Sequence, residues 1–389
     1  MPTTAKRRIE ELQKTLADHH IVAAFLIYHR DVYYYAGTAR PASLVVTPDD
    51  AVLFVRRGVE WLGDEPRLDD VREGGLGSIL DWLKAKNIQT GTAGIEMDLV
   101  PANMYVKLKM LLPGLEFVDV STFIIKQRMI KDKDEIESIR GACRMVEESH
   151  RRLPEVLKEG ITELELSAEL ESVARRHGHE TFAILRKRLE TEMGYALILS
   201  GENTRTIGGY GQVVTGKGLS PAFPYGPSQR KVEQGDVVVF DIAGLNRGYH
   251  SDLARTYCLG KASDGMLEAH AALVAIQAAM LEAAKPGVSA DMMYQTAVKK
   301  AKKLGWADHF QGHGRQKGSF VGHGLGLEID EPPLLSPKDE TVIQENMTFT
   351  TELFIVHPQF GEVKLEDTVL MTKAGPEFLT TLERKLTEI

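Results

Sequence analysis

Residues 237–256 read VVVFDIAGLNRGYHSDLART and place two acidic residues inside strand-forming sequence. Asp241 and Asp252 stand eleven positions apart, with Gly244 and Gly248 between them. A strand, a glycine-containing turn and a return strand fit this spacing, so the two carboxylates can face each other across a hairpin. Both acids have apolar or β-forming neighbours, where an unpaired carboxylate would be costly to bury.

Three further residues with similar chemistry follow in the second half of the chain. His323 lies in SFVGHGLGLEIDEPP, among glycines that allow a backbone to approach a site closely. Glu352 in MTFTTELFIV and Glu366 in EVKLEDTVLM are again acids within strand-forming sequence. Taken singly, each acid is equally typical of a hairpin end or a half-exposed strand. Together with the two aspartates they form a set of four carboxylates and one imidazole.

This set predicts a metal centre. Four carboxylates that converge without a counter-charge repel one another and raise each other's pKa, and two divalent cations would neutralise them. Oxygen ligands with one nitrogen suit manganese, cobalt, zinc or iron(II) better than calcium. Two such ions about 3.5–4 Å apart can hold a hydroxide nucleophile and polarise a scissile carbonyl.

The order Asp, Asp, His, Glu, Glu resembles that of the pita-bread metallopeptidase family, which includes methionine aminopeptidase, prolidase, Xaa-Pro aminopeptidase and creatinase. The strongest matches are the aspartate spacing, GHGLGLE at 322–328 and LED at 365–367. The resemblance covers nearly the whole chain. Residues 1–127, with DVYYYAG at 31–37, resemble the creatinase-like α/β N-terminal domain. Residues 128–389 resemble the α+β catalytic domain, which has a curved antiparallel sheet.

The resemblance implies a role for each residue of the set. Asp241 would be a bidentate ligand of one metal ion, and Asp252 and Glu366 would bridge both ions. His323 and Glu352 would complete the shell of the other ion. Glu352 would also act as general base beside the bridging hydroxide. The resemblance further implies a homodimer in which the N-terminal domain covers a neighbouring active site.

The substrate side departs from the family pattern. Tyr225, in SPAFPYGPSQRK, stands where a substrate-facing histidine is usual, and Asp330 stands where a second histidine is usual. An imidazole can donate a hydrogen bond to an oxyanion at neutral pH, whereas an ionised aspartate cannot. Tyr225 can still donate, and Asp330 would bind a substrate cation, act as a base or simply cap a turn. Lys364 replaces an arginine that is usual two residues before the second glutamate.

Three functions are compatible with these residues. The first is a dinuclear-metal hydrolase that cleaves a C–N bond, as a dipeptidase or aminopeptidase acting near proline. The second is a family member that acts on a small zwitterionic amide or amidine, as a hydrolase or lyase, which the carboxylate of Asp330 would favour. The third is a catalytically silent binding module, for which an intact ligand set is unnecessary.

The composition of the chain limits its possible partners and its possible location in the cell. The 389 residues carry a formal net charge of −8, which disfavours non-specific binding to nucleic acid. The two cysteines, Cys143 and Cys258, fit neither a disulfide framework nor a C-x-x-C metal pattern. The apolar stretch 266–284 contains charged residues and is typical of a buried helix rather than a membrane span. We therefore expect a cytoplasmic protein without a membrane segment.

Overall fold

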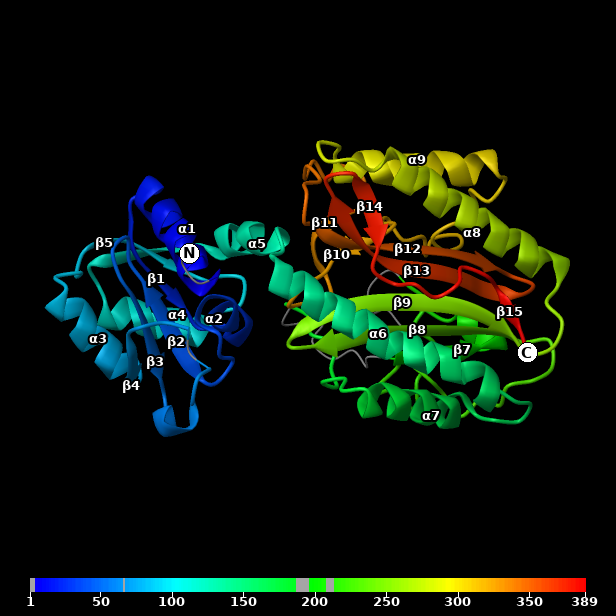
Figure 1. Cartoon of the computed structure of the whole chain (residues 1–389), viewed down its shortest axis with the longest axis horizontal. Coiled ribbons are helices and arrows are strands. Elements are labelled where there is room, and N and C mark those ends of the chain that lie inside the picture. The colour runs from blue at the N-terminus through cyan, green and yellow to red at the C-terminus, as the bar shows by residue number, and fades with distance from the viewer. Residues whose placement is uncertain (1–3, 66, 187–195, 208–212) are drawn as a thin grey trace. The chain divides into compact units, whose positions relative to one another are not determined.

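The computed structural model describes residues 4–65, 67–186, 196–207 and 213–389. The chain divides into two compact units, Met1–Arg128 and Met129–Ile389, each with a sheet and helices of its own (Figure 1).

The first unit is an α/β domain, as the sequence predicts. Its six-stranded sheet has the order β4-β3-β2-β1-β5-β6 and mixes parallel and antiparallel pairs. Apolar side chains of the sheet, such as Phe25 and Phe117, pack with Trp82 in its core. The strands are β1 (Ile21–Leu26), β2 (Ala42–Val46), β3 (Ala51–Val55), β4 (Val71–Glu73), β5 (Gly91–Ile95) and β6 (Leu115–Asp119). The helices are α1 (Thr4–Asp18), α2 (His29–Ala36), α3 (Leu76–Ala85), α4 (Ala102–Leu111) and α5 (Ser121–Met129), with the short 3₁₀ helix η1 (Val59–Trp61).

The second unit is an α+β domain built on a nine-stranded sheet, in the order β11-β10-β12-β13-β9-β8-β7, with β14 paired to β13 and β15 to β9. The strands are β7 (Ala196–Ser200), β8 (Val237–Asn246), β9 (Tyr249–Cys258), β10 (His323–Gly324), β11 (Glu331–Leu334), β12 (Thr348–His357), β13 (Gly361–Thr372), β14 (Gly375–Phe378) and β15 (Thr387–Glu388). The helices are α6 (Lys133–Val156), α7 (Glu163–Arg176), α8 (Asp264–Ala283) and α9 (Ala290–Lys303), with the 3₁₀ helix η2 (Gly201–Arg205).

The α-helices described for this unit pack on one face of the large sheet. Helices α6 and α7 cover β7 to β9, and α8 and α9 cover β12 and β13 (Figure 1). Helix α8 is long and apolar enough to cross a membrane, but half of it is buried inside the unit, where Leu273 and Ile276 pack against the sheet. Since strand side chains alternate between faces, the residues between the helix-facing ones point to the opposite face.

The hairpin of β8 and β9 has the predicted form, with two differences. Its turn is Arg247–Gly248, and both residues have positive φ, at 50° and 78°, as a type I′ turn requires. Gly244 lies within β8 instead, where an added Cβ would be 2.4 Å from Ser251 Oγ. The register pairs Asp241 with Ala254. Asp252 therefore lies diagonally from Asp241 on the same face, rather than directly opposite.

Candidate metal centre

Five strands bring the predicted ligands together on the face of the sheet that the described helices leave uncovered. The ligands are Asp241 on β8, Asp252 on β9, His323 on β10, Glu352 on β12 and Glu366 on β13. Glu352 pairs directly with Glu366 across β12 and β13, and Glu366 pairs with Ala254 of β9. The apolar residues that alternate with them, such as Leu353 and Leu365, are in the core beneath the helices. Alternation thus explains how acids and core residues share the same strands.

The ligand atoms form two groups that share one residue. In Asp252, His323 and Glu366 the ligand atoms lie within 4.8 Å of one another, and the same holds for Asp241, Glu352 and Glu366. The His323 Nε2 atom lies 3.9 Å from Asp252 Oδ2 and 4.0 Å from Glu366 Oε1. The two groups are therefore adjacent and share Glu366.

His323 is oriented by its own strand and by Thr350. Its Nδ1 lies 3.1 Å from the Gly324 carbonyl oxygen. A proton on Nδ1 would donate to that carbonyl and leave the Nε2 lone pair facing the acids. Its backbone N–H donates to Thr350 Oγ1 at 3.2 Å. Burial lowers the pKa of His323, but the charges of Asp330, Glu352 and Glu366 outweigh this effect and raise it.

The acids of the centre are strongly desolvated. Burial, reinforced by neighbouring carboxylates, raises the pKa of Asp252 and of Glu366 well above their ordinary values, and it also raises that of Asp241. Both carboxylate oxygens of Glu366 are buried and accept no hydrogen bond from the described part of the chain. A buried carboxylate in this condition is stabilised by a proton or by a cation. The donor set, four carboxylates and one imidazole, fits a divalent metal ion of the kind predicted.

A buried ion pair holds the backbone on either side of Glu366. The Arg255 guanidinium donates to the Glu366 carbonyl at 2.6 Å and forms an ion pair with Asp367 Oδ1 at 2.7 Å. Asp367 also accepts hydrogen bonds from Gln277 and Thr380. The strand position that presents Glu366 to the site is therefore anchored from its other face.

Lys364 enters the centre in a way that the sequence analysis did not predict. Its ammonium lies 2.6 Å from Asp241 Oδ2, 2.7 Å from Glu352 Oε1 and 3.4 Å from Glu366 Oε2. Burial lowers the pKa of Lys364, but the surrounding carboxylates raise it well above its usual value. The available signal was its position two residues before Glu366, because strand alternation places both side chains on one face.

The two substrate-side residues of the prediction lie in different surroundings. Tyr225 is buried, with its ring 4.2 Å from that of Phe223. Asp330 is half-buried just before β11, and its charge contributes to the raised pKa of His323. The position of Asp330 is compatible with a role at the edge of the centre. The catalytic roles of both residues stay predictions.

Glu362 is a further buried acid on this face of β13 that the sequence analysis overlooked. Burial raises its pKa from 4.5 to about 8, with Asp241 and Glu352 adding to the rise and Lys364 opposing it. The unfolded chain releases this proton near pH 4.5, whereas the folded chain keeps it until about pH 8. Stability therefore decreases as the pH rises through this window.

A Glu362→Gln variant removes this titration and should unfold at a higher temperature than the parent protein at pH 8. We expect a difference on the order of 2 kcal/mol at pH 8 and little difference near pH 4.5, because each tenfold change in proton affinity is worth about 1.4 kcal/mol and water entry relaxes part of it. Thermal unfolding of chelator-treated protein across this range measures the gap. A gap that is the same at both pH values would contradict the assignment.

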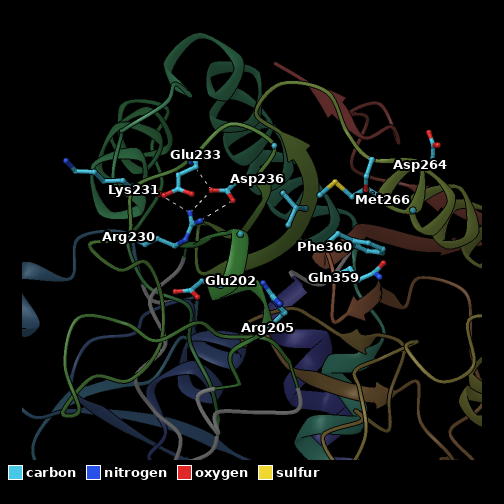
Figure 2. A pocket seen from close by; sticks show the side chains of 15 residues that line it. Glu202, Arg205, Arg230, Lys231, Glu233, Asp236, Asp264, Met266, Gln359 and Phe360 are labelled. Carbon is cyan, nitrogen blue, oxygen red and sulfur yellow. Dashed lines mark hydrogen bonds and ion pairs between the residues drawn. The ribbon is translucent and has the colours of Figure 1, made fainter.

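One hollow of the second unit lies away from the centre. It has a volume of about 890 Å³ and lies near the start of β8, at Val237. Figure 2 shows the side chains of Arg230 and Asp236 turned toward each other, and they are bonded at 2.6 Å. The described residues that line it include none of the five predicted ligands. Because the predicted ligands lie elsewhere, we do not assign the reaction to it.

Two protein-family models match this chain, one over each of its two units. Residues 137–373 match the model of metallopeptidase family M24, and residues 8–130 match that of the creatinase/prolidase N-terminal domain. An Xaa-Pro dipeptidase of Pyrococcus furiosus is 32% identical over 98% of this chain and 99% of its own.

Solved structures agree with these sequence matches. The Pyrococcus furiosus prolidase is 30% identical, with a TM-score of 0.79 over 95% of this chain and 99% of its own. An Xaa-Pro dipeptidase from Bacillus anthracis shares the fold, with a TM-score of 0.84 at 24% identity over 99% of this chain and 100% of its own. With its creatinase/prolidase-type N-terminal domain and its converging acids and histidine, the chain belongs to metallopeptidase family M24 and is a metal-dependent hydrolase.

Proposed function

We propose that this protein is an Xaa-Pro dipeptidase that works with two divalent metal ions. The observation that carries the proposal is the sharing of Glu366 by two adjacent ligand groups, with both of its oxygens free of hydrogen bonds from the described residues. The relatives named Xaa-Pro dipeptidase, which match over nearly the whole chain, support proline-containing dipeptides as substrates.

The residues would divide the work as follows. Asp241, Asp252, His323, Glu352 and Glu366 would hold the metal ions, which when bound would polarise the scissile carbonyl and acidify the attacking water. Glu352 would accept the proton of that water and return it to the leaving nitrogen. The apolar residues of the surrounding strands would keep other water molecules away from the reacting atoms.

On the substrate side, two residues would orient the dipeptide. Asp330, close enough to raise the pKa of His323, would attract the substrate's ammonium group. Tyr225 would donate a hydrogen bond to the oxyanion that forms at the scissile carbonyl. The same carboxylate of Asp330 favours a second candidate, the hydrolysis or lysis of a small zwitterionic amide or amidine.

A metal-loaded substrate screen decides between these candidates. Chelator-treated protein would be supplied separately with Mn²⁺, Co²⁺ and Zn²⁺ and offered Xaa-Pro dipeptides, the matching Xaa-Ala dipeptides, Xaa-Pro-Yaa tripeptides and small amides. We expect turnover of Xaa-Pro dipeptides above all others and loss of turnover after chelation. Tight metal binding with turnover of small amides alone would establish the second candidate instead.

We further propose manganese as the working metal, a homodimer as the working assembly and the cytoplasm as its location. Oxygen-rich ligation supports manganese, and two buried free cysteines suit a reducing compartment. Metal analysis of protein purified without added metal tests the first point. Sedimentation equilibrium tests the second, and fractionation of the source cells tests the third.

A further inference from the structure

The ammonium of Lys364 occupies oxygens that a metal ion would need. It donates to Asp241 Oδ2 and Glu352 Oε1, and it also lies within ion-pair distance of Glu366. These three acids are the members of one of the two ligand groups. A divalent cation that binds there must compete with a buried positive charge at close range, so the ammonium has to leave or the cation binds weakly.

Glu362 offers a place for a displaced ammonium. It precedes Lys364 by two residues on β13, while Val363 between them points into the helix-covered core. Both oxygens of Glu362 are buried and accept no hydrogen bond from the described residues. Its cross-strand partner is Val356, a member of a small apolar cluster. Side chains two apart on a strand lie about 7 Å apart, a distance that the four-carbon stem of a lysine can span.

The balance of charges around the metal centre also favours an ion pair between Lys364 and Glu362. Asp241, Asp252, Glu352 and Glu366 would be neutralised by two divalent ions, which would leave Lys364 as an unbalanced cation beside them. The carboxylate of Glu362, two residues away on the same face of β13, supplies a negative charge that restores neutrality. An uncompensated buried charge is strongly destabilising, so an ion pair between Lys364 and Glu362 would stabilise the metal-bound protein.

We propose that Lys364 is a displaceable internal counter-ion of the metal centre. When divalent metal binds, its ammonium moves from Asp241 and Glu352 to Glu362. Lys364 thereby weakens metal binding, and Glu362 strengthens it by receiving the displaced charge. The two residues are positioning residues for the metal, and the inference rests on the metal site of the proposed function.

The test is a double-mutant cycle on metal affinity. Isothermal titration of chelator-treated protein with Mn²⁺ would compare the parent with Lys364→Met, Glu362→Gln and the double variant. We expect the methionine variant to bind Mn²⁺ about tenfold more tightly and the glutamine variant about tenfold more weakly. In the methionine background, the glutamine change should alter the affinity less than about threefold, since no ammonium then needs a partner.

A matched control separates this pairing from general charge effects. Glu147 is a buried carboxylate on α6 that bonds Thr381 and Arg151, and Glu147→Gln should leave the Mn²⁺ affinity unchanged. Equal weakening by Glu362→Gln in both backgrounds would overturn the proposal, because it would show a simple long-range charge effect. Where Lys364→Met fails to fold, the isosteric Glu362→Gln variant alone still tests the proposal, because an unchanged Mn²⁺ affinity in that variant would overturn it.

A crystal structure of the Mn²⁺-loaded protein gives a second readout. We expect the Lys364 ammonium within hydrogen-bonding distance of Glu362, and an ammonium still bonded to Asp241 would overturn the proposal. Neither measurement depends on peptide turnover. Protein that binds Mn²⁺ with the expected coupling but cleaves no dipeptide would refute the proposed function alone, and an active enzyme without coupling would refute this inference alone.

Discussion

A Glu366→Gln variant is expected to lose more than about 10³-fold of kcat/KM and most of its bound metal. Loss of an outer hydrogen-bonding partner already costs about 10–100-fold at metal sites, and Glu366 is the residue that both ligand groups share. The amide has the same shape but no charge, so each group loses the acid that it shares with the other. Metal content by mass spectrometry and turnover of an Xaa-Pro dipeptide measure the two effects on one preparation.

Two further variants show whether this loss is specific. Asp252→Asn removes the other acid of the group formed by Asp252, His323 and Glu366, and it should behave like Glu366→Gln. Glu147→Gln removes a buried carboxylate elsewhere in the catalytic unit and should retain both metal and activity. Wild-type turnover by either ligand variant would show that the assigned residue does not hold the metal.

Replacing Arg255 with Met is expected to lower the stability of the catalytic unit by about 3–5 kcal/mol. The side chain is 1% exposed, and it donates to the carbonyl oxygens of Glu366, Leu382 and Glu383 as well as to Asp367. Methionine fills part of the space but donates nothing, so buried acceptors lose their partner at about 1–3 kcal/mol each before relaxation. Urea denaturation followed by hydrogen exchange in β9 and β13 measures the loss.

Arg384→Met is the matched control for this prediction. Arg384 also pairs with Asp367, at 2.9 Å, but its side chain is 25% exposed, so its loss should cost only about 1 kcal/mol. Equal destabilisation by the two variants would show that the Asp367 pairing matters and that the carbonyl contacts of Arg255 do not. A smaller effect at Arg255 than at Arg384 would contradict the proposed anchoring of the β13 backbone.

Much of the site could be predicted because its determinants are local. Asp241 and Asp252 belong to one hairpin, whose short turn sets their register, and the alternation of strand side chains assigns a face to each acid. The same rule identifies Leu353 and Leu365 as core residues. The position of Gly244 was wrong because a glycine in a strand, packed closely against Ser251, reads in sequence like a glycine in a turn.

The candidate ligands, their order in the chain, the hairpin that carries Asp241 and Asp252, and the two-domain family architecture could all be predicted from the amino-acid sequence, because they depend on neighbours in the chain and on motif spacing. The position of β13 between β12 and β9 depends on segments far apart in the chain, so it is known only from the folded structure. Strand alternation puts Lys364 on the same face as Glu366, but this placement of β13 brings its ammonium to Asp241 and Glu352. It also leaves Glu362 without a hydrogen-bonding partner among the described residues. A long charged side chain takes its direction from the field of all strands around it, and that field exists only once distant segments have met.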